Sequence, residues 1–560
     1  MKEKLLLFLL FFSLLHGDSV FIKFQGNKSI TERELYDIAG LHKPYFYEFY
    51  KKEPSVNAKS LTLITQTVKN FYRSRGYFHA VVTHSLKEGY AQVVVQENAP
   101  VLVSDISTLS PKEISLAIPF KNGAVFDAQK FEESKKDIKL LYADAGYCKA
   151  TLYAKAWVDI DANLAYLTYQ VEQGALCYFT KLSISPSETI DADIIESLLY
   201  IEEGEPFSTK SIRQSYESLY AQEGISKALI NTDSHGNVTV SITENEKPIR
   251  FQAGLGVSSD EGLMALLGIK HRNLFTNLKT LGLSTRVTEI KQTIQTNFDM
   301  PLANRNSTGA EVGYSNELFL GFKEEKVFGS IFLKQRNTPY QFQESLVFDH
   351  SLTYDSQDEV LFEPGALFIL SPKLEWNYDT RDNLLNPTNG HFIRTEAMGS
   401  LQSEISDATY YKYKLSVAYI MPFLPSTVAL KASLGSLHLF NGGLPPSYLF
   451  YAGGMNSNRA YGYRKLGPTN ENGDPIGFNS LLETTAEYRF AIYGKLRGVL
   501  FSDNTFIGKG EVPNYDKGYY SAGVGLRYIT PIGPIAVDFG FDINDPTQRY
   551  AFHFHIGELF

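Results

Sequence analysis

One arginine, Arg459, sets the main chemical requirement of this sequence. It lies in a glycine-rich polar stretch, residues 452–468, within a long region whose residues otherwise alternate as β-strands do. If that stretch is a loop folded inside a β-barrel, the guanidinium group needs a carboxylate partner, which it can bind through a two-pronged hydrogen-bonding fork. Glu487 lies on the polar face of the alternating segment 482–490, so we expect it to face the lumen. The alternative is that Arg459 is an ordinary solvated loop arginine.

The remaining polar residues do not form a catalytic pattern. The sequence contains no Ser/His/Asp motif context, phosphate-binding loop or nucleotide fingerprint. His553 and His555 have strand spacing, and we expect them to line a lumen rather than to bind a metal. The net charge of -9, without a long basic run, argues against a nucleic-acid partner. We therefore expect no enzyme activity, no cofactor and no metal site.

The N-terminal residues have the pattern of a signal peptide. A basic start precedes the apolar run Leu5–Leu15, which is too short to cross a bilayer as a helix, and we place the cleavage near Gly17. No later stretch approaches 18 consecutive apolar residues. We therefore expect an exported chain whose membrane span, if it has one, is a barrel.

Two cysteines, Cys148 and Cys177, lie 29 residues apart near an expected domain junction. In an exported protein they could form a disulfide that braces this junction. Two free, partly buried thiols are the alternative. Two cysteines without histidine help are too few for a structural zinc site.

The first half of the chain is a threefold repeat. The segments FYRSRGYFHAVV (71–82), LYADAGYCKATL (141–152) and LYAQEGISKALI (219–230) share a helix end that leads into a strand. The glycines at their junctions are expected to have positive φ as helix C-caps. Each unit is predicted as β-α-α-β-β, over residues 18–99, 100–175 and 176–247. Their open sheet edges could accept a strand from a partner, or the units could be spacers without ligands. The aligned glycines are Gly76, Gly146 and Gly224.

After Pro248 the sequence period changes to two. In residues 249–258, 411–419, 520–528 and 535–542, one face is apolar and the other is small or charged. We count about 16 such segments over residues 248–560. A soluble sandwich would also alternate, but the aromatic strand ends favour a membrane barrel. The predicted fold class is therefore three α+β repeats followed by an all-β transmembrane barrel of about 16 antiparallel strands.

Several segments resemble known families. The repeats, with their β-α-α-β-β order and Tyr-x-x-x-Gly junctions, resemble POTRA domains. The hairpin 378–393, the stretch GGMNSNRAYGYR, the strand pair 526–543 and the wall strand 499–506 resemble the BamA/TamA superfamily of outer-membrane insertases. The resemblance selects Asp503 as a second partner of Arg459 and includes Tyr461 in the loop motif; Asn458 and Ala460 depart from the usual residues. The hairpin motif residues are Asp379, Arg381, Asp382, Pro387 and Gly390.

Three repeats are closest to the TamA branch of this superfamily, since BamA has five and two-partner-secretion transporters usually have two. The resemblance implies an outer-membrane barrel with its repeats in the periplasm, which inserts β-barrel or autotransporter clients through a lateral seam. It also implies contact with outer-membrane lipid and with a TamB-like, inner-membrane-anchored partner. The alternatives are a two-partner-secretion pore and an anchor for a lipid-transport bridge. The seam would join Phe251, Gly254 and Gly256 to the C-terminal strand with Phe554 and Phe560, which ends in a pattern similar to a barrel-targeting signal.

Overall fold

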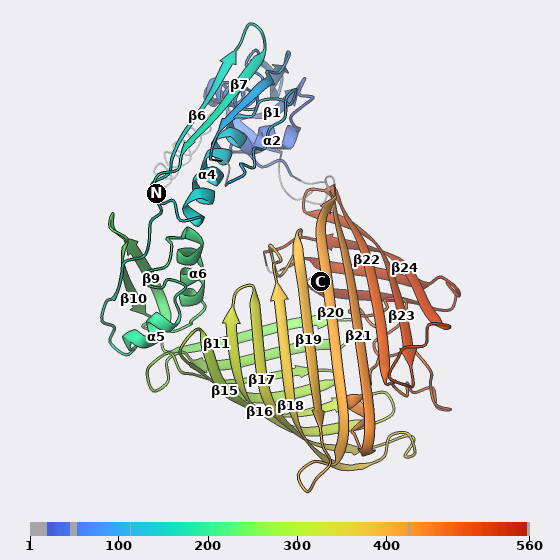
Figure 1. Cartoon of the computed structure of the whole chain (residues 1–560). Helices are drawn as coiled ribbons and strands as arrows, with labels where there is room; N and C mark the ends of the chain where they lie inside the picture. The colour runs from blue at the N-terminus through green and yellow to red at the C-terminus, as the bar shows by residue number, and fades with distance from the viewer. Residues whose placement is uncertain (1–18, 45–52, 112–113, 424–425, 532, 557–560) are drawn as a thin grey trace, which may run out of the picture. The chain divides into compact units, whose positions relative to one another are not determined.

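The computed structural model describes residues 19–44, 53–111, 114–423, 426–531 and 533–556 (Figure 1). The predicted signal peptide and Phe560 lie outside the described residues. Contacts divide the chain into two units. The first contains residues up to 182 together with 201–213 and 232–238, and the second contains 183–200, 214–231 and the chain from 239 onward. None of the described helices is both long enough and apolar enough to cross a membrane.

The first repeat forms a four-stranded sheet in the order β2-β1-β4-β3, in which β1 and β4 are parallel. Thr31 caps the first helix in a capping box with Glu34. The short strand β2 was not expected from the sequence. Leu35, Val68 and Tyr72 are fully buried under the sheet. The elements are β1 (Ser19–Gln25), α2 (Glu32–Ile38), β2 (Ser55–Asn57), η2 (Ala58–Ser60), α3 (Leu61–Ser74), β3 (Val81–Lys87) and β4 (Tyr90–Gln96).

A carboxylate just after β4 holds the turn that precedes α2. Glu97 accepts hydrogen bonds from the backbone amides of Lys28 (2.7 Å) and Ser29 (2.9 Å) and from the Tyr72 hydroxyl (3.0 Å). Partial burial raises the pKa of Glu97, but these hydrogen bonds outweigh it and leave the pKa below its ordinary value. Glu244 binds the corresponding turn of the third repeat through Ser187 (2.6 Å) and the Thr189 amide (2.7 Å).

The second repeat departs from the predicted element order. Its sheet has the order β5-β7-β6, and it contains one α-helix among its described residues where two were expected. Residues 114–127 take an irregular path, in which Pro119 lacks an amide hydrogen and disfavours helical geometry in the residue before it. The elements are β5 (Leu102–Leu109), α4 (Ala128–Asp144), β6 (Thr151–Asp159) and β7 (Leu164–Glu172).

A disulfide joins Cys148 and Cys177. Cys148 follows α4, and Cys177 lies in the segment that leads to the third repeat, where its amide donates to the Gly146 carbonyl (2.9 Å). The bond therefore ties the end of the second repeat to the beginning of the next. The third repeat has the sheet order β8-β10-β9. Its elements are β8 (Lys181–Ile184), α5 (Ala192–Ser197), α6 (Thr209–Tyr220), β9 (Ile225–Thr232) and β10 (Asn237–Glu244).

The three aligned glycines do not share one conformation. Gly76 and Gly146 have the predicted positive φ, of 91° and 94°. Gly224 does not, so the prediction was wrong at that position. There a Cβ atom would lie 2.7 Å from the Leu278 side chain and 3.1 Å from the Arg272 carbonyl. Glycine is needed at 224 because the barrel approaches closely, rather than because of backbone strain.

The second unit contains a 16-stranded antiparallel sheet in which each strand pairs with the next in sequence. The predicted fold class is confirmed. Alternate side chains point outward, so that Phe251, Leu255 and Phe552 are 76%, 91% and 66% exposed in the absence of lipid. The strands are β11 (Ile249–Ser258), β12 (Gly262–His271), β13 (Thr280–Thr288), β14 (Lys291–Pro301), β15 (Asn306–Leu318), β16 (Lys323–Asn337), β17 (Tyr340–Tyr354), β18 (Gly365–Asp379), β19 (Gly390–Ser400), β20 (Ala408–Phe423), β21 (Ser426–Gly442), β22 (Ser480–Tyr493), β23 (Leu496–Gly508), β24 (Gly518–Tyr528), β25 (Ile535–Asp542) and β26 (Tyr550–Ile556).

Part of the third repeat belongs to the same unit and contacts the turns at one end of the barrel. Asn277 exchanges hydrogen bonds with Asp191, and Arg305 donates to the Leu199 carbonyl (2.7 Å). Glu223 lies 3.2 Å from Lys270. These contacts identify the barrel end formed by the β12–β13 and β14–β15 turns as the end beside the repeat.

Replacing Glu97 with Gln should loosen the turn before α2. Loss of the anionic acceptor weakens hydrogen bonds to two amides, for which we expect about 1 kcal/mol of local stability to be lost. Because its pKa is lowered by folding, Glu97 contributes stability above its ordinary pKa of about 4.5 and loses it as the pH falls through the folded pKa. The hydrogen-exchange protection factors of residues 27–31, which are corrected for the intrinsic pH dependence of exchange, should therefore fall in Glu97→Gln, and in the wild type on acidification. The exposed Glu88→Gln is the matched control, and equal exchange in both variants at pH 7 would contradict this role.

Candidate functional site

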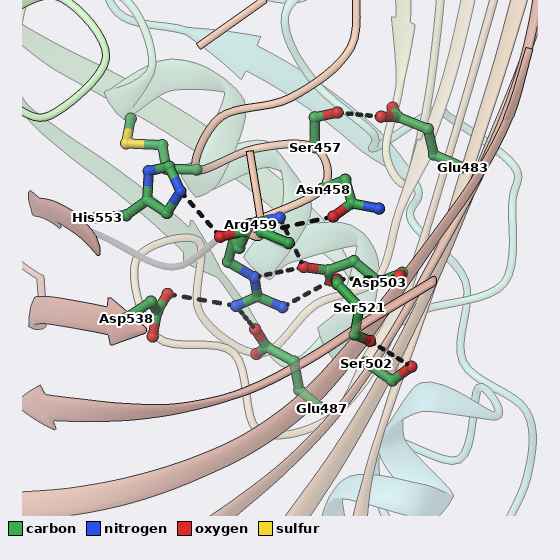
Figure 2. A network of polar contacts seen from close by, with 12 residues as sticks. Ser457, Asn458, Arg459, Glu483, Glu487, Ser502, Asp503, Ser521, Asp538 and His553 are labelled. Carbon is green, nitrogen blue, oxygen red and sulfur yellow. Dashed lines mark hydrogen bonds and ion pairs between the residues drawn. The ribbon is translucent and has the colours of Figure 1, made fainter. Parts of the chain in front are cut away.

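The loop between β21 and β22, residues 443–479, folds into the barrel lumen. After a 3-10 turn, η3 (Pro446–Tyr448), it makes antiparallel bridges that include Phe450 with Phe478 and Ala452 with Leu466. These four side chains are 8% exposed or less and pack with residues of the barrel wall. The loop is therefore packed as part of the protein interior, and its tip carries Arg459 to the wall formed by β22–β26 (Figure 2).

The Arg459 side chain is fully buried and binds three carboxylates. Its Nε and Nη2 atoms donate to the two oxygens of Asp503, each at 2.8 Å, in the two-pronged geometry expected for this pair. Its Nη1 atom donates to Glu487 at 2.6 Å and to Asp538 at 3.3 Å. The carboxylates lie on β23, β22 and β25, so one loop side chain connects three strands (Figure 2).

Two further arginines complete this buried cluster. Arg489 lies 2.9 Å from Glu487, and Arg527 donates to both oxygens of Asp538 at 2.6 and 3.0 Å. Three cations thus face three anions, and every member is 7% exposed or less. Such compensation is required because an unpaired charge in this setting is strongly destabilising. The cluster consists of Arg459, Glu487, Arg489, Asp503, Arg527 and Asp538.

Ring and backbone contacts fix the guanidinium from other directions. The guanidinium carbon lies 3.5 Å from the centre of the Phe501 ring, a cation–π contact. The Arg459 amide donates to Asp503 (3.1 Å), and its carbonyl lies 3.1 Å from Nε2 of His553 on β26. A Cβ atom on Gly540 would come within 2.3 Å of that carbonyl. The loop tip therefore fits against bare backbone of β25.

The two unusual loop residues have specific surroundings. Asn458 is fully buried and donates to the Tyr519 carbonyl (3.2 Å) and to Thr505 (3.4 Å), while its own oxygen accepts from the Ala460 amide (3.2 Å). Ala460 is 2% exposed and does not have a positive φ, so its position does not require glycine. The amide of Asn458 therefore replaces an aliphatic contact with hydrogen bonds to β23 and β24.

Tyr461 anchors the next residue of the loop. Its hydroxyl donates to Asp542 at the end of β25, and Arg549 lies 3.9 Å from the same carboxylate. At the other side of the tip, Met455 donates its amide to Asp260 (2.9 Å), which lies in the turn between β11 and β12. His553 contacts this aspartate at 3.4 Å. The loop thus touches residues near both ends of the strand series.

The predicted hairpin motif forms the β18–β19 turn. Arg381 binds both oxygens of Asp379 (2.9 and 2.6 Å), and Asp382 accepts from the amides of Thr388 (2.9 Å) and Asn389 (3.2 Å). Gly390 has a φ of 115°, and a Cβ there would lie 2.4 Å from the Thr380 carbonyl. The Pro387 carbonyl accepts from Arg489 at 3.4 Å. Through Arg489, this turn meets the Arg459 cluster.

The predicted seam residues lie on the first and last strands. Phe251, Gly254 and Gly256 lie on β11, and Phe554 on β26. The described residues contain no ladder between these strands. Instead, the Ser259 amide donates to the Phe554 carbonyl (3.1 Å), and the Phe554 amide donates to the Ser259 hydroxyl (3.4 Å). Each of the other neighbouring strand pairs in the sheet forms a ladder.

The structure brings together Arg459, Glu487 and Asp503, which sequence reasoning had grouped. That reasoning did not assign Asp538, Arg527 or Arg489 to the cluster. Period-two alternation puts Asp538 and Arg527 on the polar face of their strands, which was the available signal. Alternation does not give the position of a residue along the barrel axis, so it could not identify the ion-pair partner of Asp538 or Arg527.

Comparison with known proteins assigns the family. The Omp85 superfamily domain matches residues 250–560, and a POTRA model, described as surface antigen variable number repeat, matches residues 21–99 and 101–174. The chain belongs to the Omp85 superfamily. A barrel of this family preceded by POTRA repeats indicates the outer membrane.

Two relatives are similar over nearly the whole chain. The outer membrane protein assembly factor BamA of Nitratidesulfovibrio vulgaris is 21% identical and is matched over 96% of this chain and 73% of its own length. BamA of Neisseria meningitidis serogroup B is 20% identical, over 96% and 78%. The crystal structure of BamA from Haemophilus ducreyi lacking POTRA domains 1–3 is 18% identical, covers 82% of this chain and 99% of its own, and gives a TM-score of 0.56. This structural likeness supports the fold.

Replacing Arg459 with Ala should leave a folded barrel whose activity is lost or reduced. Removing the cation leaves buried carboxylates undercompensated, which typically costs about 3–5 kcal/mol, and less where water reaches the site. The barrel strands retain their own ladders. We expect Arg459→Ala to reach the outer membrane, to keep heat-modifiable gel mobility and to fail to complement a deletion strain. The exposed Arg336→Ala serves as the control, and full complementation by Arg459→Ala would contradict the loop's role.

Gly540→Ala should displace the loop tip without changing any charge. The added methyl would lie 2.3 Å from the Arg459 carbonyl and 2.5 Å from its carbon, so the backbone of either the loop or β25 has to move. We expect faster hydrogen exchange in residues 452–468 and reduced complementation. At Gly443 a Cβ meets only Leu367 side-chain atoms at 3.5 Å or more, so Gly443→Ala is the control. Unchanged exchange in Gly540→Ala would mean that the close approach is unimportant.

Proposed function

We propose that this protein is an outer-membrane assembly factor that folds and inserts β-barrel or autotransporter clients through the seam between β11 and β26. The single observation that carries the proposal is the state of this seam, which has one backbone–backbone hydrogen bond among the described residues. Neighbouring strands elsewhere in the sheet share ladders of seven or more residue pairs. Among the described residues, the weakest connection in the barrel wall is therefore between its first and last strands.

Unpaired strand edges can template a client strand. The backbone N–H and C=O groups of β11 and β26 that lack partners can hydrogen-bond an added strand, as in other cases of β-augmentation. The client's own pairing and burial then drive its insertion, and the protein performs no chemical step. This is why we infer an activity that is not enzymatic.

The two strands at the seam are shorter than β21, and this difference favours insertion of a client strand at the seam. β11 has 10 residues and the described part of β26 has 7, whereas β21 has 17. At about 3.4 Å per residue, β26 extends roughly 24 Å and β21 roughly 58 Å. A bilayer that matches the short strands must thin near the seam, and such mismatch lowers the cost of inserting a new strand there.

Within the superfamily, we infer a TamA-type role with a TamB-like inner-membrane-anchored partner. Three repeat sheets precede the barrel, and the number of repeats is the feature that favours TamA over BamA. The relatives described above are BamA proteins, so the TamA assignment is our inference from repeat number. The repeats would lie in the periplasm, where their sheet edges could meet the partner or clients.

The loop inside the lumen favours lateral insertion of clients over secretion of a polypeptide through the pore. The loop with Arg459 occupies the interior beside β22–β26 and is held there by buried ion pairs. Passage of a polypeptide through the lumen would require those pairs to break. Lateral opening would leave them intact.

A reversible cross-link across the seam tests the proposal. The change is Ser259→Cys with Phe554→Cys, which places two thiols where the strands already touch. Oxidation should abolish assembly of outer-membrane clients in a depleted strain, and a reductant should restore it, because the seam can no longer part. The measurement is the level of folded client barrels before and after reduction.

A cross-link within a complete ladder is the matched control. Thr285 and Ile294 face each other between β13 and β14, so Thr285→Cys with Ile294→Cys closes a pair of strands that need not separate. This control should retain activity when oxidised. If the seam cross-link leaves client assembly at the control level, insertion through the seam is wrong. Loss of a single secreted protein, without loss of barrels, would favour a translocation pore.

A further inference from the structure

A cavity lies beside the loop, at the end of the barrel away from the turns that contact the third repeat. It has a volume of about 800 Å³ and lies between the loop, the β23–β24 connection and the residue that precedes β26. Among the described residues its lining holds four basic side chains and no acidic one. They are Lys465, Lys509, Lys517 and Arg549.

The backbone holds these four residues around the cavity. The Lys465 amide donates to the Gly462 carbonyl (3.1 Å), and the Arg549 amide donates to the Asp545 carbonyl (3.0 Å). The Lys509 carbonyl accepts from the Asn479 side chain (2.9 Å). Lys517 directly precedes β24. The backbone positions of these four residues are therefore set before a ligand arrives, while the long side chains can adjust.

The positive charges around this cavity are not neutralised by acidic residues of its lining. Arg549 lies 3.9 Å from Asp542 and 3.8 Å from Asp545, but no ion pair involves Lys465, Lys509 or Lys517 in the part of the chain that the structure describes. Like charges gathered around a concavity attract anions more strongly than the same charges on a flat surface. The cavity thus has a surplus of about three positive charges.

The rest of the lining is largely apolar or aromatic. Phe478, Ile507 and Tyr519 contribute to it, and lysine side chains can cover such surface with their methylene groups while the ammonium groups remain at the rim. A small hydrated inorganic ion would use only the rim. A ligand that joins anionic groups to a less polar body would use both parts.

We infer that this cavity binds phosphate groups. Ammonium groups are effective partners for phosphate oxygens, and several of them together can match its multiple charge. The chemistry is shared by two sources, a phosphorylated lipid headgroup and free phosphate in solution. If the repeats lie in the periplasm, as in the proposed function, this end of the barrel faces the outer leaflet. The binding site itself does not depend on the insertion activity.

The test uses the full chain purified in a non-ionic detergent. Binding of sodium pyrophosphate, lipid A and enzymatically dephosphorylated lipid A is measured by microscale thermophoresis at fixed ionic strength. The test variant is Lys465→Gln/Lys509→Gln/Lys517→Gln. The control is Lys87→Gln/Lys155→Gln/Lys227→Gln, which makes the same change in net charge at exposed lysines of the repeats. Heat-modifiable mobility confirms that both variants contain a folded barrel.

We expect the wild type and the control to bind a phosphorylated probe and the test variant to bind it at least tenfold more weakly. Binding of lipid A alone would identify a lipid headgroup as the source, and equal binding of pyrophosphate would identify free phosphate. The inference is overturned if the wild type binds neither probe or if the two variants lose affinity equally. Equal affinity of the wild type for dephosphorylated lipid A would also overturn it. Client assembly by the test variant is scored separately, so failure of the seam mechanism would not be confused with failure of this site.

Discussion

The burial of Arg459 is the constraint on which the interior of this barrel depends. A guanidinium group with no exposed surface must be neutralised where it lies, because removing a charge from water costs several kcal/mol that only close, well-directed partners can offset. Asp503, Glu487 and Asp538 supply those partners from three strands. Arg489 and Arg527 then balance the remaining negative charge. The loop is therefore placed by electrostatics as well as by packing.

The Arg459 cluster makes the connections among the strands that it joins stronger than the connection at the seam between β11 and β26. The loop tip contacts β22, β23 and β25 through ion pairs and β26 through His553, so these strands share one buried cluster. Across the seam, in contrast, the described residues form no ladder, and the end of β11 meets β26 through hydrogen bonds of Ser259 with Phe554 and His553. A barrel that must part at one place benefits from strong connections elsewhere. The Arg459 cluster provides such connections among the strands next to the seam.

Patterns that depend on local geometry could be predicted from the sequence. Alternation identified the barrel, and the helix-end pattern identified the positive φ of Gly76 and Gly146, because both depend on nearest neighbours. The pairing of Arg459 with Glu487 and Asp503 needed the family resemblance as well as the strand pattern. Gly224, by contrast, was misread because its need for glycine comes from a distant segment at Leu278. Alternation placed Asp538 on the correct face of its strand. Its ion-pair partner, however, depends on the stagger between neighbouring barrel strands, which the sequence of one strand does not encode.

A double-mutant cycle on Arg459 and Asp503 tests the central claim most directly. Hydrogen exchange of residues 455–461 would be measured in the full-length wild type, Arg459→Gln, Asp503→Asn and the double variant, all in lipid bilayers. If the loop is held by this ion pair, the single changes should each release it and the double change should add little, giving a coupling energy of about 1 kcal/mol or more. Additive effects, or unchanged protection in Arg459→Gln, would contradict the account.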